Sequence, residues 1–161
     1  GGVIQEAVDA GGGVILGKTT LYPLGREVGK MGTVPYYMLS HPEKVLSNKA
    51  MTLFTEVAVG ERIELMTGSL QSLATRAGRV AAFLTEHDMR FKEIAGAFIV
   101  YCAGCMLTVG EKIADVVDGL KQHLVGVPFM GVFTFGEQGC FKNGESKHGN
   151  LMISVIIFGR R

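Results

Sequence analysis

Two amphipathic helical patterns on either side of a short apolar run constrain this chain more than any other feature. The run at residues 98–101 is wholly apolar, which is typical of a central strand that helices cover. Such a pattern predicts helices packed on a β-sheet. The first helix is expected to begin at Ser69, with an apolar stripe of Leu70, Leu73, Ala74, Ala77, Val80, Ala81 and Leu84. The second carries the stripe Ile113, Val116, Val117, Leu120 and Leu124.

The start and end of the second helix are marked by particular residues. Thr108 and Glu111 fit the spacing of a capping box, Thr-x-x-Glu, at a helix start. Gly126 and Pro128 are residues that end a helix. The sequence therefore predicts that this helix begins close to Thr108.

Further strands are predicted on both sides of the helices. Residues 51–57 and 62–66 alternate in polarity around Gly60 and predict an antiparallel hairpin, and residues 129–135 and 151–158 predict two later strands. The order is then β-β-α-β-α-β-β. Strands joined by helices run parallel, whereas hairpins are antiparallel. The sequence therefore predicts the α/β (α+β) class, with a mixed β-sheet and helices packed on it.

The N-terminal part shows weaker patterns. Residues 3–8 predict a short helix, residues 14–16 a short buried strand and residues 36–39 an edge strand, whereas most of 17–49 reads as irregular. With 161 residues and 47% hydrophobic content, the chain is large enough for one core and is not disordered. We expect a single domain over residues 1–161, with an irregular part at 1–49 and a compact core at 50–159.

Charge and cysteine content exclude several classes of protein. Sixteen Lys and Arg oppose fifteen Asp and Glu, so no strong field exists to attract nucleic acid. The longest weakly polar stretch, residues 95–110, is too short to span a membrane. Three cysteines without a dense framework predict reduced thiols and a cytoplasmic location. No start methionine, signal peptide or targeting tail is visible. Because Gly1 is an unusual first residue, we also expect the chain to be a piece of a longer protein.

A nucleotide-binding motif is matched in letters only. Residues 12–19 read G-x-x-x-x-G-K-T, as in a phosphate-binding loop. Such a loop needs a buried strand before it and a helix after it, but here the preceding residues read as helical. Pro23 and Gly25 oppose a following helix. We therefore expect a strand with an exposed Lys18, although a nucleotide-binding enzyme stays an alternative.

The cysteines suggest two further chemistries. Cys102 and Cys105 form a C-x-x-C pair between a predicted strand and a predicted helix, where redox pairs often lie. With the helix expected only at Thr108, two buried unreactive thiols are the favoured interpretation, and a thiol-dependent enzyme is an alternative. Cys140 and His148 could complete a zinc site with this pair, but the set lacks a recognised spacing. We expect neither a metal nor a cofactor.

Polar residues gather where predicted strands end. Glu137, between Gly136 and Gly139, follows one strand, and His148 and Asn150 precede the next. Loops at strand ends commonly carry binding groups. Glu137 could recognise an amine, and the Asn150 amide can donate and accept hydrogen bonds at once. The alternative is that both residues only satisfy backbone groups in a long glycine-rich turn, for which Asn143-Gly144 is a signal.

These segments in this order resemble the C-terminal half of the FIST domain. The resemblance rests on C-A-G at residues 102–104, a helix, the strand V-P-F-M-G-V-F-T-F-G-E at 127–137, and H-G-N at 148–150 before a final apolar strand. It covers residues 101–158 specifically and the earlier segments only in layout. The resemblance implies a non-catalytic sensory domain of signal-transduction proteins, and of F-box proteins in eukaryotes. It also implies a small ligand of the amino-acid type.

The resemblance and the loop positions together predict the ligand-binding residues, which are Cys102, Gly104, Cys105, Gly136, Glu137, His148 and Asn150. The chain departs from the family pattern at two of them. Cys105 stands where relatives have an arginine that could grip a carboxylate, and Gly149 separates the histidine from the asparagine. We expect a small-molecule ligand, a protein partner or attached signalling domain, no nucleic acid and no membrane. A protein-interaction adaptor in ubiquitin or signalling assemblies is a further alternative.

Overall fold

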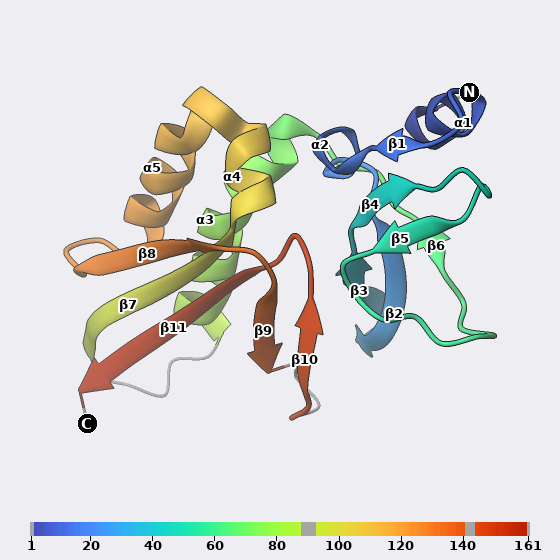
Figure 1. The fold of residues 1–161 in the computed structure, drawn as a ribbon. Coiled ribbons are helices and arrows are strands. Elements are labelled where there is room, and N and C mark those ends of the chain that lie inside the picture. The colour runs from blue at the N-terminus through green and yellow to red at the C-terminus, as the bar shows by residue number, and fades with distance from the viewer. Residues whose placement is uncertain (1, 88–92, 141–143, 161) are drawn as a thin grey trace. The chain divides into compact units, whose positions relative to one another are not determined.

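The computed structural model in Figure 1 describes residues 2–87, 93–140 and 144–160. The chain divides into two units, which are considered separately. Unit 1 comprises Gly1–Gly68 and Gln138–Leu151, and unit 2 comprises Ser69–Glu137 and Met152–Arg161. The expectation of a single domain over residues 1–161 stays a prediction.

Unit 2 is built on a three-stranded mixed sheet in the order β11-β7-β8. The central strand β7 (Glu93–Cys102) is antiparallel to β11 (Ile153–Arg160) and parallel to β8 (Phe129–Thr134). Ile99 of β7 therefore lies opposite Val155 on one side and Gly131 on the other. The parallel pair is joined through helices, as parallel strands require. The predicted α/β class, the mixed sheet and the central position of residues 98–101 are confirmed.

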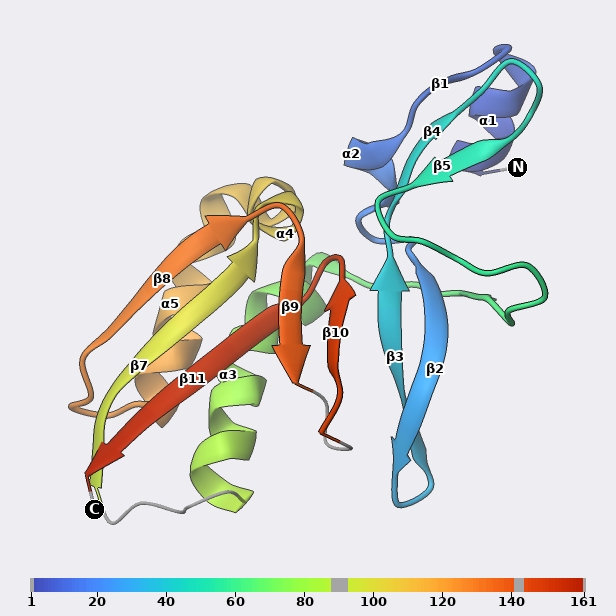
Figure 2. The same cartoon turned by 60° about the horizontal axis from the view of Figure 1, so that its bottom comes forward.

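Helices cover the sheet of unit 2, as Figure 2 shows. They are α3 (Leu70–His87), α4 (Ala103–Val109), the 3-10 turn η1 (Gly110–Lys112) and α5 (Ile113–His123). The α3 stripe is confirmed at Leu73, Ala74, Ala77 and Ala81, which are buried, but Leu70 is exposed. In the second stripe Val117 is likewise exposed, whereas Val116, Leu120 and Leu124 are buried. Ser69 precedes α3 as predicted, and its Oγ accepts a hydrogen bond from the Ser72 N–H at 3.1 Å.

The predicted capping box is wrong. Thr108 lies inside α4, where its Oγ donates to the carbonyl oxygen of Gly104 one turn earlier at 2.8 Å. Glu111 lies in η1, and α5 has no side-chain cap. The reason is that helical structure already begins at Ala103, directly after β7. A threonine hydroxyl that bonds back to the preceding turn can stand within a helix as well as before one.

Two three-stranded sheets form the larger part of unit 1, which also contains most of a third, two-stranded sheet. One has the order β1-β4-β5, formed by β1 (Gly13–Val14), β4 (Pro42–Val45) and β5 (Met51–Leu53). The other has the order β3-β2-β6, formed by β2 (Leu24–Met31), β3 (Val34–Ser40) and β6 (Glu64–Leu65). The predicted N-terminal helix is confirmed as α1 (Val3–Asp9), with Ala7 packed in a core with Ile15 and Val45. The predicted edge strand is confirmed as β3.

Several expectations for unit 1 are wrong. Residues 17–49 are not irregular, because they contain α2 (Leu16–Thr19), β2, β3 and β4. The two segments of the expected hairpin do not pair with each other: β5 pairs with β4, and β6 pairs with β2. The expected strand at 14–16 ends at Val14, which is exposed. In each case pairing with distant strands overrides the local pattern.

The segment expected as a long loop contains two short paired strands, β9 (Glu137–Cys140) and β10 (Ser146–Gly149). The predicted turn signal includes Asn143, which lies outside the described residues. None of the helices in the described part of the chain combines the length and the hydrophobicity needed to cross a membrane.

Candidate functional site

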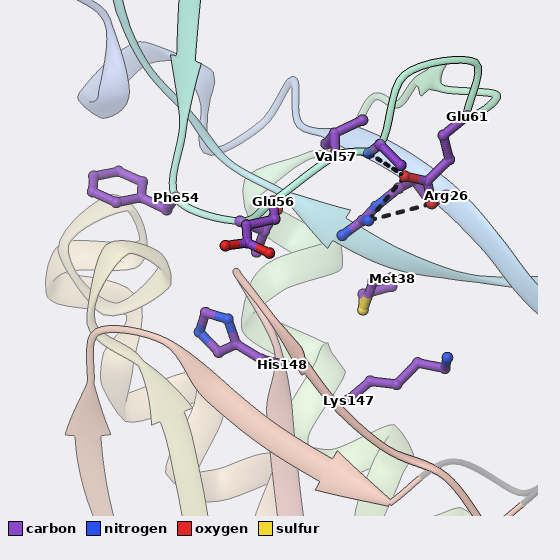
Figure 3. Close-up of a pocket in the computed structure, with 10 residues that line it drawn as sticks. Arg26, Met38, Phe54, Glu56, Val57, Glu61, Lys147 and His148 are labelled. Atoms are coloured by element: carbon purple, nitrogen blue, oxygen red, sulfur yellow. Dashed lines mark hydrogen bonds and ion pairs between the residues drawn. The ribbon is translucent and has the colours of Figure 1, made fainter.

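Unit 1 contains a pocket of about 910 Å³. Its walls come from β2, β3, β10 and the segment that follows β5 (Figure 3). Pockets of roughly 300–1,000 Å³ are typical of small-molecule sites. The lining residues are Arg26, Met38, Phe54, Thr55, Glu56, Val57, Ala58, Glu61, Lys147 and His148.

The Arg26 side chain forms one charged wall of this pocket. It projects from β2, and the residue is only 8% exposed. Its Nη1 lies 3.3 Å from each carboxylate oxygen of Glu61 (Figure 3). These distances are long for a charge-assisted hydrogen bond, for which roughly 2.7–2.9 Å is usual. Among the described residues, the buried Nε of Arg26 has no hydrogen-bond partner. Arg26 therefore retains donor capacity beside the pocket.

Glu61 carries a negative charge at the same wall. The Ala58 N–H donates a hydrogen bond to its carboxylate at 3.1 Å, and this bond is the main reason why the pKa of Glu61 is lowered. Arg26 and Lys147 lower the pKa further by attraction. Glu61 is therefore ionised at neutral pH.

β10 adds positive charge to the pocket, and the segment after β5 adds a second carboxylate. Lys147 and His148 project from β10, and the Lys147 ammonium forms an ion pair with Glu145 at 2.8 Å. Glu56 is exposed, and the described residues include no hydrogen-bond or ion-pair partner for its carboxylate. Figure 3 shows Glu56 and His148 facing the same space. The pocket can thus hold a cationic and an anionic group at once.

The predicted thiol pair lies in unit 2, where β7 meets α4. Cys102 is the last residue of β7, and Cys105 is the third residue of α4. Both are buried and not in a disulfide. A hydrogen bond from the Cys105 thiol lowers the pKa of Cys102 to about 7, against the opposing effect of burial. The same bond, followed by burial, raises the pKa of Cys105. Gly104, between the two cysteines, is buried in α4.

Glu137 is the most completely buried carboxylate among the described residues, at 1% exposure. One oxygen accepts a hydrogen bond from the Thr134 hydroxyl at 3.1 Å, and the other accepts the Met152 N–H at 3.2 Å. Glu137 thereby links the end of β8 to the start of β11 within unit 2. Gly136 precedes it with a φ of 89°, a left-handed turn conformation that glycine adopts without strain. These contacts favour structural roles for both residues.

Asn150 is buried in unit 1 and satisfies backbone groups. Its Oδ1 accepts the His41 N–H at 3.1 Å, and its own N–H donates to the Leu39 carbonyl at 3.0 Å. Its Nδ2 donates to the Gly149 carbonyl at 3.3 Å. The dual capacity predicted for this amide is therefore used within the chain.

The segment with phosphate-loop letters lacks the geometry for that function. The expected strand with an exposed Lys18 is wrong, because Lys18 and Thr19 lie in α2. Lys18 is exposed and lies 3.8 Å from Glu6, whereas the hydroxyl of Thr19 is buried and donates to the Pro42 carbonyl at 2.8 Å. The two residues that would contact phosphate and magnesium therefore have separate surroundings. The alternative zinc set divides between the units, with Cys140 and His148 in unit 1. Within the described ranges, no group of three or more His, Cys, Asp or Glu side chains could hold a metal ion.

The fold and the pocket define an α/β domain with a small-molecule-sized cavity. The chain matches the model of the FIST C domain over residues 3–140, and it belongs to this family. The FIST C domain is a sensory domain of signal-transduction proteins, and the family is not known for catalysis. Neither the curated proteins nor the solved structures include a match to this chain. The match begins well before residue 101 and ends at Cys140, so His148 and Asn150 lie beyond it.

Of the predicted site residues, the structure brings Cys102, Gly104, Cys105 and Glu137 together in unit 2. Of the remaining positions, only His148 lines the pocket of unit 1. Sequence reasoning missed Arg26, Glu56, Glu61 and Lys147. The sequence held no clear signal for Arg26, because the glycines of its segment interrupt the alternation expected of a strand. The others come from separate segments that only the tertiary fold joins.

Proposed function

We propose that this domain senses a small zwitterionic ligand, an amino acid or a close derivative, in the pocket of unit 1. The main observation in support of this proposal is that cationic and anionic side chains line one pocket of suitable size. Arg26 and Lys147 supply positive charge, and Glu56 and Glu61 supply negative charge. An α-amino acid carries the complementary pair of groups.

Arg26 is the residue best suited to bind the ligand carboxylate. A guanidinium presents five donors and binds carboxylates with two parallel hydrogen bonds. Its long contacts with Glu61 and its unpartnered Nε leave that capacity available. A buried donor without a partner costs about 1–3 kcal/mol, so an acceptor oxygen from a ligand stabilises this site.

The ligand amine is expected to face Glu56, whose carboxylate has no partner among the described residues. Met38, Phe54 and Val57 offer apolar surface for a side chain. His148 stands beside this surface on β10, which agrees with its predicted role in ligand binding. Because β10 leads along the chain into β11, a ligand held by β10 also restrains the segment that enters unit 2.

Ligand contacts by Cys102, Gly104, Cys105, Gly136, Glu137 and Asn150 stay a prediction. The burial of these side chains and their bonds within the chain weaken it. A protein partner, an attached signalling domain, F-box association, a cytoplasmic location and the absence of catalysis likewise stay predictions.

The test is a thermal-unfolding screen of the full chain against the individual amino acids at millimolar concentration. A ligand at one hundred times its dissociation constant stabilises the folded state by about 2.7 kcal/mol. We expect a rise in melting temperature with at least one amino acid, and no rise with the matching amine or carboxylic acid alone. If none of the amino acids raises the melting temperature, the proposal is wrong.

Two substitutions locate the effect. Arg26→Met keeps the apolar stem and removes the guanidinium, so it should abolish the ligand-dependent rise. Arg62→Met is the matched control, because the Arg62 side chain is 88% exposed, is paired with Glu64 and lies outside the pocket lining. An unchanged response in Arg26→Met would place the ligand elsewhere.

A further inference from the structure

The thiol pair of unit 2 has a geometry that differs from the one its sequence suggested. The expected helix start at Thr108 would have left Cys105 in a loop. Instead, α4 begins at Ala103, so Cys102 and Cys105 occupy the end of β7 and the first turn of α4. The two cysteines are three residues apart across this strand–helix junction, and each shifts the pKa of the other through their side chains. The ligand pocket of unit 1 does not include this pair.

We propose that Cys102 and Cys105 form a redox pair, which a hydroperoxide converts into an intramolecular disulfide bond. The pair belongs to unit 2 and does not depend on the ligand pocket. Both thiols are free in the structure, which corresponds to the reduced state.

The reaction proceeds in two balanced steps. The Cys102 thiolate attacks one peroxide oxygen, so that a sulfur–oxygen bond forms, the oxygen–oxygen bond breaks, and hydroxide leaves and takes up a proton. Cys105 then loses its proton and attacks the sulfur of the sulfenic acid. The sulfur–sulfur bond forms, the sulfur–oxygen bond breaks, and water leaves. The peroxide is reduced to two molecules of water, and the two thiols are oxidised.

The electrostatics of the pair favour this order. The bond from Cys105 lowers the pKa of Cys102 to about 7, so a large share of Cys102 is thiolate at neutral pH. The hydrogen bond to Cys102 and the negative charge on its sulfur raise the pKa of Cys105. Once Cys102 is a neutral sulfenic acid, that charge is gone and Cys105 ionises more easily. The negative charge of Glu137 raises the pKa of both thiols, and the positive charge of Arg76 lowers the pKa of Cys105.

Burial selects the oxidant. Cys102 is 5% exposed and Cys105 is fully buried, whereas Cys140 in unit 1 is exposed. A bulky thiol reagent therefore reaches Cys140 first. Hydrogen peroxide, the smallest hydroperoxide, is therefore the oxidant used to test Cys102. Cys140 thus serves as the internal control for an ordinary surface thiol.

The test is oxidation of the folded full chain by hydrogen peroxide, followed by alkylation, trypsin digestion and mass spectrometry. Both cysteines of the pair lie in the tryptic peptide of residues 93–112. We expect this peptide to lose about 2 Da through disulfide formation and to regain the mass after reduction with dithiothreitol. The wild-type chain suffices for this measurement, so it does not depend on the folding of a variant.

A variant separates the two steps. In Cys105→Ser the disulfide cannot form, and oxidation should stop at the Cys102 sulfenic acid, which adds about 16 Da to the peptide. In a parallel sample, dimedone should trap this sulfenic acid as a covalent adduct. In Cys140→Ser the loss of about 2 Da should persist. The proposal is overturned if residues 93–112 of the wild-type chain retain two alkylatable thiols under conditions that oxidise Cys140.

Discussion

A close backbone contact between α3 and α5, at Gly78 and Gly119, provides a sharp test of the helix packing in unit 2. A Cβ atom added to Gly78 would lie 2.9 Å from the carbonyl oxygen of Gly119, with the carbon of that carbonyl at 3.0 Å and the Gly119 Cα at 3.2 Å. All three atoms belong to the backbone, so the contact can be relieved only if one helix moves. Gly78→Ala should therefore destabilise the domain.

The magnitude follows from two opposing effects. Overpacking a close contact costs about 1–3 kcal/mol. Alanine in place of glycine within a helix stabilises the folded state by about 0.5–1 kcal/mol. The net loss is then about 0–2.5 kcal/mol, which lowers the melting temperature of a chain of this size by up to about 10 °C. Thermal unfolding followed by circular dichroism measures this shift.

The same contact supplies its own control. A Cβ atom added to Gly119 would meet Gly78 no closer than 3.7 Å, which is ordinary van der Waals contact. Gly119→Ala should therefore leave the melting temperature unchanged or raise it, through the helix propensity of alanine. If Gly78→Ala stabilises the chain as much as Gly119→Ala does, the described packing of α3 against α5 is refuted.

Three other predictions concern buried groups. Asn150→Ala should lower the free energy of unfolding by about 1–3 kcal/mol in urea titrations, because it leaves the His41 N–H unpaired; unchanged stability would contradict the structural role. Burial lowers the pKa of His41 below 6.5, so the unfolded state binds more protons than the folded state. The free energy of unfolding should therefore fall as the pH drops below 6.5, and His41→Gln should make it less dependent on pH in this range. The peroxide reaction of Cys102 should slow about tenfold from pH 8 to pH 6, and a midpoint near pH 9 would exclude an activated thiol.

The elements of unit 2 could be predicted because their signals are local. The α3 stripe repeats over about four turns, and β7 contains a continuous apolar run, so neither signal depends on distant partners. α4 was missed because the Cys-Ala-Gly-Cys segment lacks a polar N-cap, and its first residues follow directly from a strand. The apparent capping box at Thr108 led to a helix start predicted five residues too late, because α4 already begins at Ala103.

Unit 1 was harder to predict because its strands depend on pairing between distant segments. Leu24 of β2 pairs with Ser40 on one side and Leu65 on the other. Two glycines and the inward-facing Arg26 interrupt the alternation of β2. The absence of a side chain at Gly29 leaves room for the Tyr36 ring of the adjacent strand, a requirement that appears only once the strands are paired.

The candidate site divides in the same way. The spacing of Cys102 and Cys105 is visible in the sequence, and their contact follows from that spacing once α4 begins at Ala103. The pocket of unit 1 joins β2, β3, β10 and the segment after β5, so no single stretch of sequence carries its pattern. Glu137 and Asn150 were recognised as important positions, but their bonds to backbone groups favour the structural interpretation over ligand binding.

The most direct test of the ligand pocket is a titration of the ¹⁵N-labelled chain with an amino acid that raises its melting temperature, followed by backbone chemical shifts. The account predicts that the largest changes cluster at Arg26, Glu56 and His148, and that Arg26→Met suppresses them. Changes centred on Cys102 and Glu137, with the residues of the unit 1 pocket unaffected, would contradict it.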